Sequence, residues 1–168
     1  GAVFGYKQGG QISKIGLEFY NDLLKRSVAK KTQALDEKRS VDIFFFGKSL
    51  IPLYYVLDES DRFSFYTKIN KSINHQVVLD IEKELVDRYG KPPKETINYL
   101  NLARLKIVLK NTFVKSLSIN QDNIEFILET GRVNDSFIRN ALVFENKLIK
   151  DRKFKETKGV PSFVVFFD

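Results

Sequence analysis

The sequence predicts an α+β domain in which amphipathic helices pack on a small, mainly antiparallel sheet. Apolar residues recur at helical spacing between residues 58 and 109, whereas short β-branched and aromatic runs separated by polar turns fill much of residues 114 to 167. Helices and strands are therefore segregated along the chain, and strict alternation would instead indicate a doubly wound sheet. With 43% hydrophobic residues, the 168-residue chain is suited to one globular domain of ordinary size.

The N-terminal forty residues predict a loop, a helix and a connection. Residues 1 to 10 contain four glycines and show no periodic pattern. An amphipathic helix is expected from about Ser13 to Ala29, and the polar run Lys30 to Ser40 connects it to a short strand, Val41 to Phe46. The apolar stripe of this helix consists of Ile12, Ile15, Phe19 and Leu23.

Three further helices are predicted between residues 58 and 110. Asp58 is a suitable N-cap for the first, and Gly90 can end the second with a left-handed cap. Pro93 opens the third, which is apolar on more than one side and is expected to be the most buried. The stripes are Phe63, Tyr66, Ile69 and Ile73 in the first helix, Val78, Ile81, Leu85 and Tyr89 in the second, and Ile97, Leu100, Ala103 and Ile107 in the third.

The C-terminal third predicts strands around one short helix. Val114 to Ile119 and Ile124 to Leu128 flank a polar turn and indicate a β-hairpin. A helix is expected near residues 135 to 142. The last apolar run, Phe163 to Phe167, has the length and composition of a strand, and its expected partner lies between Phe144 and Phe154.

Most enzymatic chemistry lacks the residues it requires. The chain has no cysteine and a single histidine, His75, which excludes thiolate metal sites and multi-histidine metal sites. No phosphate-binding loop is present, because Gly47-Lys48-Ser49 lacks the upstream glycine of a Walker sequence. We therefore predict no catalytic residue, no metal site and no cofactor for this chain, and His75 is interpreted as a surface residue.

The net charge of +7 leaves two interpretations open. Basic residues gather weakly between Arg104 and Lys115 and again between Lys147 and Lys158. Solvated faces of a lysine-rich protein explain them most simply, since no groove motif accompanies them. The alternative is a free-standing module that binds nucleic acid or RNA polymerase through this basic surface, which requires both stretches to be exposed on one side.

Two carboxylates are the strongest candidates for a binding site. Glu84 and Asp87 are three residues apart, so they lie about 60° from each other around the predicted helix. We expect both on the face opposite the apolar stripe, pointing to solvent or to a partner.

Three stretches carry a resemblance to a known family. They occur in family order and cover roughly residues 1 to 119. They are Gly5-Tyr6-Lys7-Gln8-Gly9-Gly10; Ile51-Pro52 with Tyr55, Asp58-Glu59, Arg62 and Tyr66; and Glu84-Leu85-Val86-Asp87-Arg88-Tyr89-Gly90-Lys91-Pro92-Pro93 with Ala103-Arg104-Leu105-Lys106. The second and third stretches resemble the C-terminal domain of bacterial transcription-repair coupling factors. The first resembles the end of the translocation motif in the same family.

The resemblance implies a regulatory domain of a larger DNA repair protein. Family members are ATP-dependent double-stranded DNA translocases, with helicase motifs, that displace stalled RNA polymerase and recruit UvrA for nucleotide excision repair. Their C-terminal domain is autoinhibitory and packs against a UvrB-like module of the same parent chain. Glu84, Asp87 and Arg88 match the residues that make this contact, and Gln8 matches a residue of motor coupling.

The same resemblance implies a division of the chain and of its chemistry. Residues 1-12 would be a remnant of the motor loop, residues 13-40 a linking helix and polar connection, and residues 41-168 the regulatory domain. ATP and Mg²⁺ would bind the parent protein outside this chain. The parent would be located in the bacterial cytoplasm and would have no membrane partner. The chain contains no methionine, and we expect it to be a piece of that parent.

Overall fold

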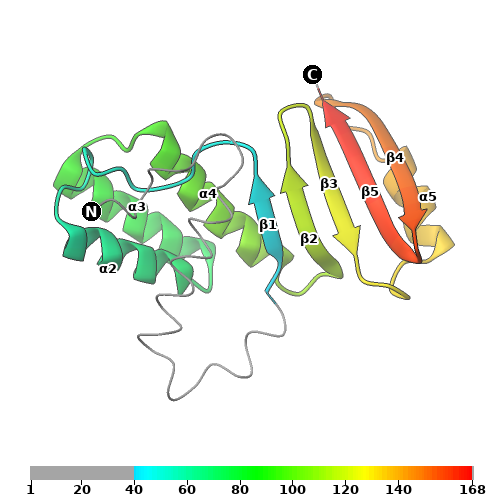
Figure 1. Cartoon of the computed structure of the whole chain (residues 1–168), viewed down its shortest axis with the longest axis horizontal. Helices are drawn as coiled ribbons and strands as arrows, with labels where there is room; N and C mark the ends of the chain where they lie inside the picture. The colour runs from blue at the N-terminus through cyan, green and yellow to red at the C-terminus, as the bar shows by residue number, and fades with distance from the viewer. Residues whose placement is uncertain (1–39, 168) are drawn as a thin grey trace, which may run out of the picture.

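The computed structural model describes residues 40–167. Gln8 and the predicted helix from Ser13 to Ala29 therefore lie outside the described residues. So do the proposed motor-loop remnant, residues 1-12, and all but the last residue of the proposed connection, residues 13-40. Figure 1 shows the helices before residue 110 gathered at one end of an open sheet, and the short helix after residue 134 at the other end. The elements are β1 (Asp42–Phe45), α2 (Glu59–Asn70), α3 (His75–Tyr89), α4 (Lys94–Leu109), β2 (Val114–Ile119), β3 (Asn123–Leu128), α5 (Asp135–Val143), β4 (Ile149–Thr157) and β5 (Val160–Phe167).

The sheet has the strand order β1-β2-β3-β5-β4 and confirms the predicted α+β class. β1 pairs with β2 in parallel, and the other neighbours are antiparallel. One row of apolar side chains crosses all of the strands in register: Ile43, Leu117, Phe126, Phe163 and Phe154. At the β1 end, Ile43 and Leu117 join the core of α2, α3 and α4, which is how the helices pack on the sheet.

The predicted helix boundaries are largely correct, and the residues predicted to cap the first two helices lie at their ends. Asp58 accepts a hydrogen bond from the Asp61 amide at 2.8 Å and begins α2. Gly90 ends α3 with a φ of 81°, which a side chain would strain, but its ψ of −166° is not that of the predicted left-handed cap. The hairpin, the short helix α5 and the final strand also form where predicted. Within the described part of the chain, no helix combines the length and apolarity needed to cross a membrane.

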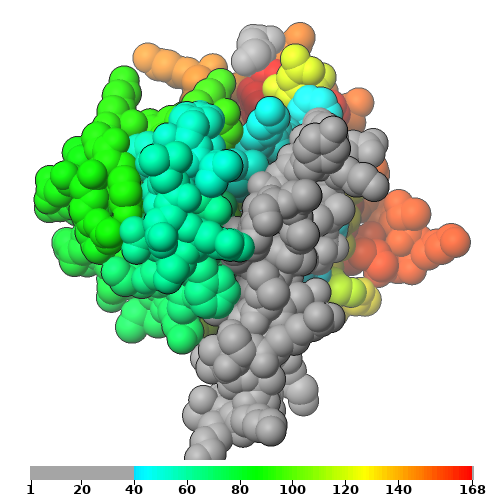
Figure 2. All heavy atoms as spheres, turned by 60° about the vertical axis from the view of Figure 1, so that its left-hand side comes forward, coloured from blue at the N-terminus to red at the C-terminus, as the bar shows by residue number. Residues whose placement is uncertain are grey.

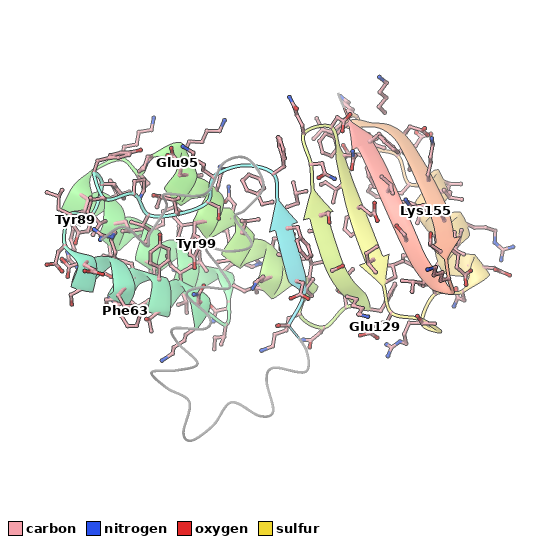
Figure 3. The ribbon with its side chains drawn as sticks, in the orientation of Figure 1. Phe63, Tyr89, Glu95, Tyr99, Glu129 and Lys155 are labelled. Carbon is pink, nitrogen blue, oxygen red and sulfur yellow. The ribbon has the colours of Figure 1, made fainter. Side chains whose placement is uncertain are left out.

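The predicted apolar stripe of α2 is wrong at two positions. Phe63 is 37% exposed and lies on the outer side of α2 (Figure 3), and Ile73 is 75% exposed. The helix ends at Asn70, so Ile73 belongs to the turn before α3, whose N-cap is Asn74. The buried face of α2 instead includes Arg62 and Phe65. Since Arg62 is charged, apolar spacing alone does not place it on the buried face.

α4 is the central helix of the core, as its apolar character predicts. Six of its residues are buried, among them Tyr99, which lies among the helices in Figure 3. The Tyr99 ring meets the Tyr66 ring edge-on at 5.0 Å, and its hydroxyl donates a 2.7 Å hydrogen bond to Oδ1 of Asn70. This bond joins α4 to the end of α2 inside an otherwise apolar cluster.

Tyr99 is expected to make stability fall at alkaline pH. Burial raises the pKa of Tyr99 well above its ordinary value, so the folded protein holds this proton more tightly than the unfolded chain does. The free energy of unfolding should therefore be unaffected by this group below about pH 10 and decline as the pH rises further. Urea unfolding between pH 8 and 11 should show a shallower decline for Tyr99→Phe than for the wild type. Parallel declines would assign the effect to other groups.

Candidate functional site

The segment between β1 and α2 is fastened to the helices by the motif residues of α2. The Arg62 guanidinium, which is buried, donates Nη1 hydrogen bonds of 2.6 and 2.9 Å to the carbonyls of Val56 and Leu57. The Tyr66 hydroxyl accepts a hydrogen bond from the Ile51 amide at 2.5 Å. In Figure 2 this cyan segment lies against the green helices. Arg62 and Tyr66 therefore hold a loop in place and are not free to bind a partner.

α2 and α3 form an antiparallel pair joined by charges of alternating sign. The Lys68 ammonium lies 3.3 Å from the Glu84 carboxylate, and Glu84 also meets Arg88 of its own helix at 3.5 Å. Arg88 reaches back to Asp61 at 3.2 Å. We call these four residues, Asp61, Lys68, Glu84 and Arg88, the charge chain. Its side chains are between 37% and 46% exposed, so each pair contributes little alone but together they fix the positions of their charged groups.

Aromatic rings lie beneath the charge chain. The Arg88 guanidinium stands 5.5 Å from the Phe65 ring centre and 5.0 Å from that of Tyr89, and the Lys68 ammonium stands 5.2 Å from Phe65. The Tyr89 hydroxyl donates to Oδ2 of Asp61 at 3.1 Å. Burial and this hydrogen bond raise the pKa of Tyr89, so the hydroxyl keeps its proton and remains a donor at neutral pH.

The two candidate carboxylates have different surroundings. Asp87 is exposed, and its carboxylate makes no hydrogen bond or ion pair with any residue of the described range 40–167. Glu84 does not lie opposite the apolar stripe as expected, because α2 packs against that flank of α3 and supplies Lys68. The arrangement therefore offers one unpaired carboxylate beside a fixed row of charges, which suits recognition of a cationic group on a protein.

A family model identifies the family of this chain. The TRCF domain matches residues 47–137, a range that contains α2, α3, α4, the β2–β3 hairpin and all four residues of the charge chain. The chain belongs to the TRCF domain family. Asp87 and Arg88 thus lie inside the family's own domain.

Individual relatives agree with this family assignment. The transcription-repair-coupling factor of Buchnera aphidicola is 28% identical over 89% of this chain, and that of Myxococcus xanthus is 33% identical over 80%. The chain spans 19% and 11% of those two proteins. A crystal structure of the C-terminal domain of transcription-repair coupling factor superposes with a TM-score of 0.59 at 21% identity, covering 76% of this chain and 81% of that one, and so has the same fold.

The basic stretches of this TRCF domain lie on separate elements. Arg104 is half-buried and pairs with Glu82 of α3, which removes it from the basic face that nucleic-acid binding requires. Lys115 is the second residue of β2, whereas the stretch from Lys147 to Lys158 contains β4, and β3 and β5 separate these two strands. Among residues 40–167, no group of three or more metal-ligating side chains gathers.

The supporting residues Asp61 and Lys68 were not among the residues predicted to form the site. Their signal is present in the sequence: they are seven residues apart on one helix, and Glu84 and Arg88 are four apart on the next. Two helices joined by a short turn lie antiparallel, which places Asp61 opposite Arg88 and Lys68 opposite Glu84.

Proposed function

We propose that this TRCF domain is the non-catalytic, autoinhibitory regulatory domain of a transcription-repair coupling factor. In the parent, an ATP-dependent double-stranded DNA translocase with its ATP and Mg²⁺ site elsewhere, the domain holds the UvrB-like module and masks the surface for UvrA. Motor engagement with DNA and with stalled RNA polymerase then releases the module. Family membership supports the assignment to this class of repair protein.

The unpaired carboxylate of Asp87 is the observation on which this proposal rests. The four residues of the charge chain pair with one another, and Asp87 alone among the three proposed partner residues is left without an ion pair in the described part of the chain. A partner arginine can bind its carboxylate through two parallel hydrogen bonds. Glu84 and Arg88 then contribute by fixing the charges around that contact.

Reversing the charge of Asp87 in the full-length parent should strengthen the binding of UvrA. Losing one partner of an interfacial charge pair costs about 2–5 kcal/mol, so Asp87→Lys should raise UvrA affinity about tenfold or more. Calorimetric titration of UvrA into the parent measures this change. The thermal midpoint of the 168-residue chain should stay the same, because an exposed substitution outside the charge chain costs within about 0.5 kcal/mol.

Two control variants separate this result from trivial causes. Glu156→Lys makes the same change in net charge on exposed β4 and should leave UvrA affinity unaltered. Glu84→Lys sets three cations together with Lys68 and Arg88, so it should also lower the thermal midpoint. Unchanged UvrA affinity in a folded Asp87→Lys parent would refute the autoinhibitory contact.

A further inference from the structure

Exposed apolar residues form a ridge at the C-terminal end of α5. Four large apolar side chains occur within seven residues, and their exposed fractions are 40% for Leu142, 71% for Val143, 62% for Phe144 and 76% for Leu148. Single exposed apolar residues are ordinary on protein surfaces, but a contiguous group marks an interaction site. We call these four residues the α5 ridge.

Hydrogen bonds fix the shape of the α5 ridge. The Phe144 amide donates to the carbonyl of Asn140 at 3.1 Å and caps the helix. The Leu148 amide donates to Oδ1 of Asn146 at 2.9 Å within the next turn. The Arg152 guanidinium donates to the carbonyl of Leu142 at 2.9 Å, which ties the helix end to β4. The ridge is therefore ordered before any partner arrives, which lowers the entropic cost of binding.

The charge around the α5 ridge selects the class of partner. Residues 139–158 contain seven basic and three acidic side chains. Part of this charge is used within the chain: Arg152 donates to the Leu142 carbonyl, Lys155 lies 3.9 Å from Glu125, Lys153 stands 5.5 Å from the Phe166 ring centre, and Lys150 also has a contact. Arg139 is exposed one turn before the apolar residues, and Lys147 is exposed among them, as is the acidic Glu145. An apolar centre with a basic rim is complementary to an apolar segment with an acidic rim.

We propose that the α5 ridge docks an acidic amphipathic segment of a partner protein, with Phe144 and Leu148 as its main anchors. Aromatic and large aliphatic side chains supply most of the binding energy at such sites, and the surrounding charges supply orientation and rate of association. A second copy of this chain is a poorer occupant, because its own ridge carries the same basic rim.

The α5 ridge is independent of the Asp87 contact. α5 lies beside β4, whereas α3 lies beyond β1 at the opposite end of the sheet (Figure 1). The ridge also begins after residue 137, where the match to the TRCF domain ends. Occupation of one site leaves the other accessible, so this inference does not depend on the regulatory function proposed above.

A designed peptide tests the α5 ridge on the 168-residue chain. The probe is a fluorescein-labelled 16-residue helix with leucines on one face and glutamates elsewhere, and its matched control carries lysines in place of the glutamates. Fluorescence anisotropy should show saturable binding of the acidic peptide that weakens as salt is raised, and no binding of the basic one. Phe144→Ser together with Leu148→Ser should weaken binding about tenfold or more, since each anchor loses its buried apolar area.

A second pair of variants controls for unspecific loss of apolar surface. Leu53→Ser with Ile73→Ser removes side chains that are 62% and 75% exposed, closely matching Phe144 and Leu148, but far from α5, and should leave peptide affinity unchanged. Equal binding by the ridge variant and the wild type would overturn the proposal. So would ridge-dependent dimers in sedimentation, which would assign the surface to a second copy, or ridge-dependent binding of a single-stranded DNA 20-mer without peptide binding.

Discussion

Replacing Arg62 by leucine should lower the free energy of unfolding by about 2–4 kcal/mol. The guanidinium is the donor for the Val56 and Leu57 carbonyls. Val56 is fully buried, so the variant leaves its carbonyl without a partner inside the protein, and the part-buried bond to Leu57 is lost as well. We attribute the loss of stability to the missing hydrogen-bond donor of Arg62 and not to its missing positive charge. Urea denaturation of the 168-residue chain gives the change from the transition midpoint.

Lys68→Leu is the matched control for Arg62. It removes a cation six residues farther along the same helix, where the side chain is 46% exposed and its ion pair with Glu84 contributes less than about 1 kcal/mol. If the two variants unfold at the same urea concentration, the hydrogen bonds of Arg62 do not hold the segment before α2.

Leu85→Ala is expected to cost about 2–5 kcal/mol, the other large effect. Leu85 is fully buried where α3 meets the core, and truncation leaves a cavity that its close-packed neighbours fill only in part. Equilibrium unfolding in urea measures this loss as well, and the slope of the transition should not change.

Val86→Ala shows whether the loss depends on burial. Val86 is the next residue of α3 and is 44% exposed, so removing its methyl groups should change stability within about 0.5 kcal/mol. Similar costs at both positions would mean that α3 does not bury the face containing Leu85. A clear difference would also establish that the Asp87 surface can be altered without loss of the fold.

Capping residues and apolar spacing were sufficient to predict the elements between residues 41 and 167. Asp58, Gly90 and the polar turn at residues 120 to 123 act through local backbone geometry, which a sequence reveals directly. The spacing failed at Ile73, since apolar periodicity continues past the residue where α2 loses its hydrogen bonds. It also gave no sign that Arg62 is buried, because its acceptors are carbonyls, which every residue has.

The candidate site was predicted only in part for a related reason. Helical spacing gives the direction of Glu84 around α3, but it does not say which flank α2 covers. Glu84 lies about 60° from the buried Ile81, close enough to the α2 flank to meet Lys68. Asp87 lies farther round and stays unpaired within the described residues. Tertiary packing thus separates two carboxylates that the sequence presents as equivalent.

The parallel pairing of β1 with β2 gives the domain a particular mechanical character. Asp42 of the edge strand pairs with Ser116, so the whole α2–α4 segment lies in the chain between these two paired residues. The strands of the β2–β3 hairpin, in contrast, are separated by a short turn. Closing so long a loop is entropically slow, and β1 should be the last strand to join during folding. A pull applied through the residues before Ser40 acts first on that same strand. Force on the N-terminal side would therefore detach β1, and with it the loop held by Arg62, before it disturbs the hairpin or α5.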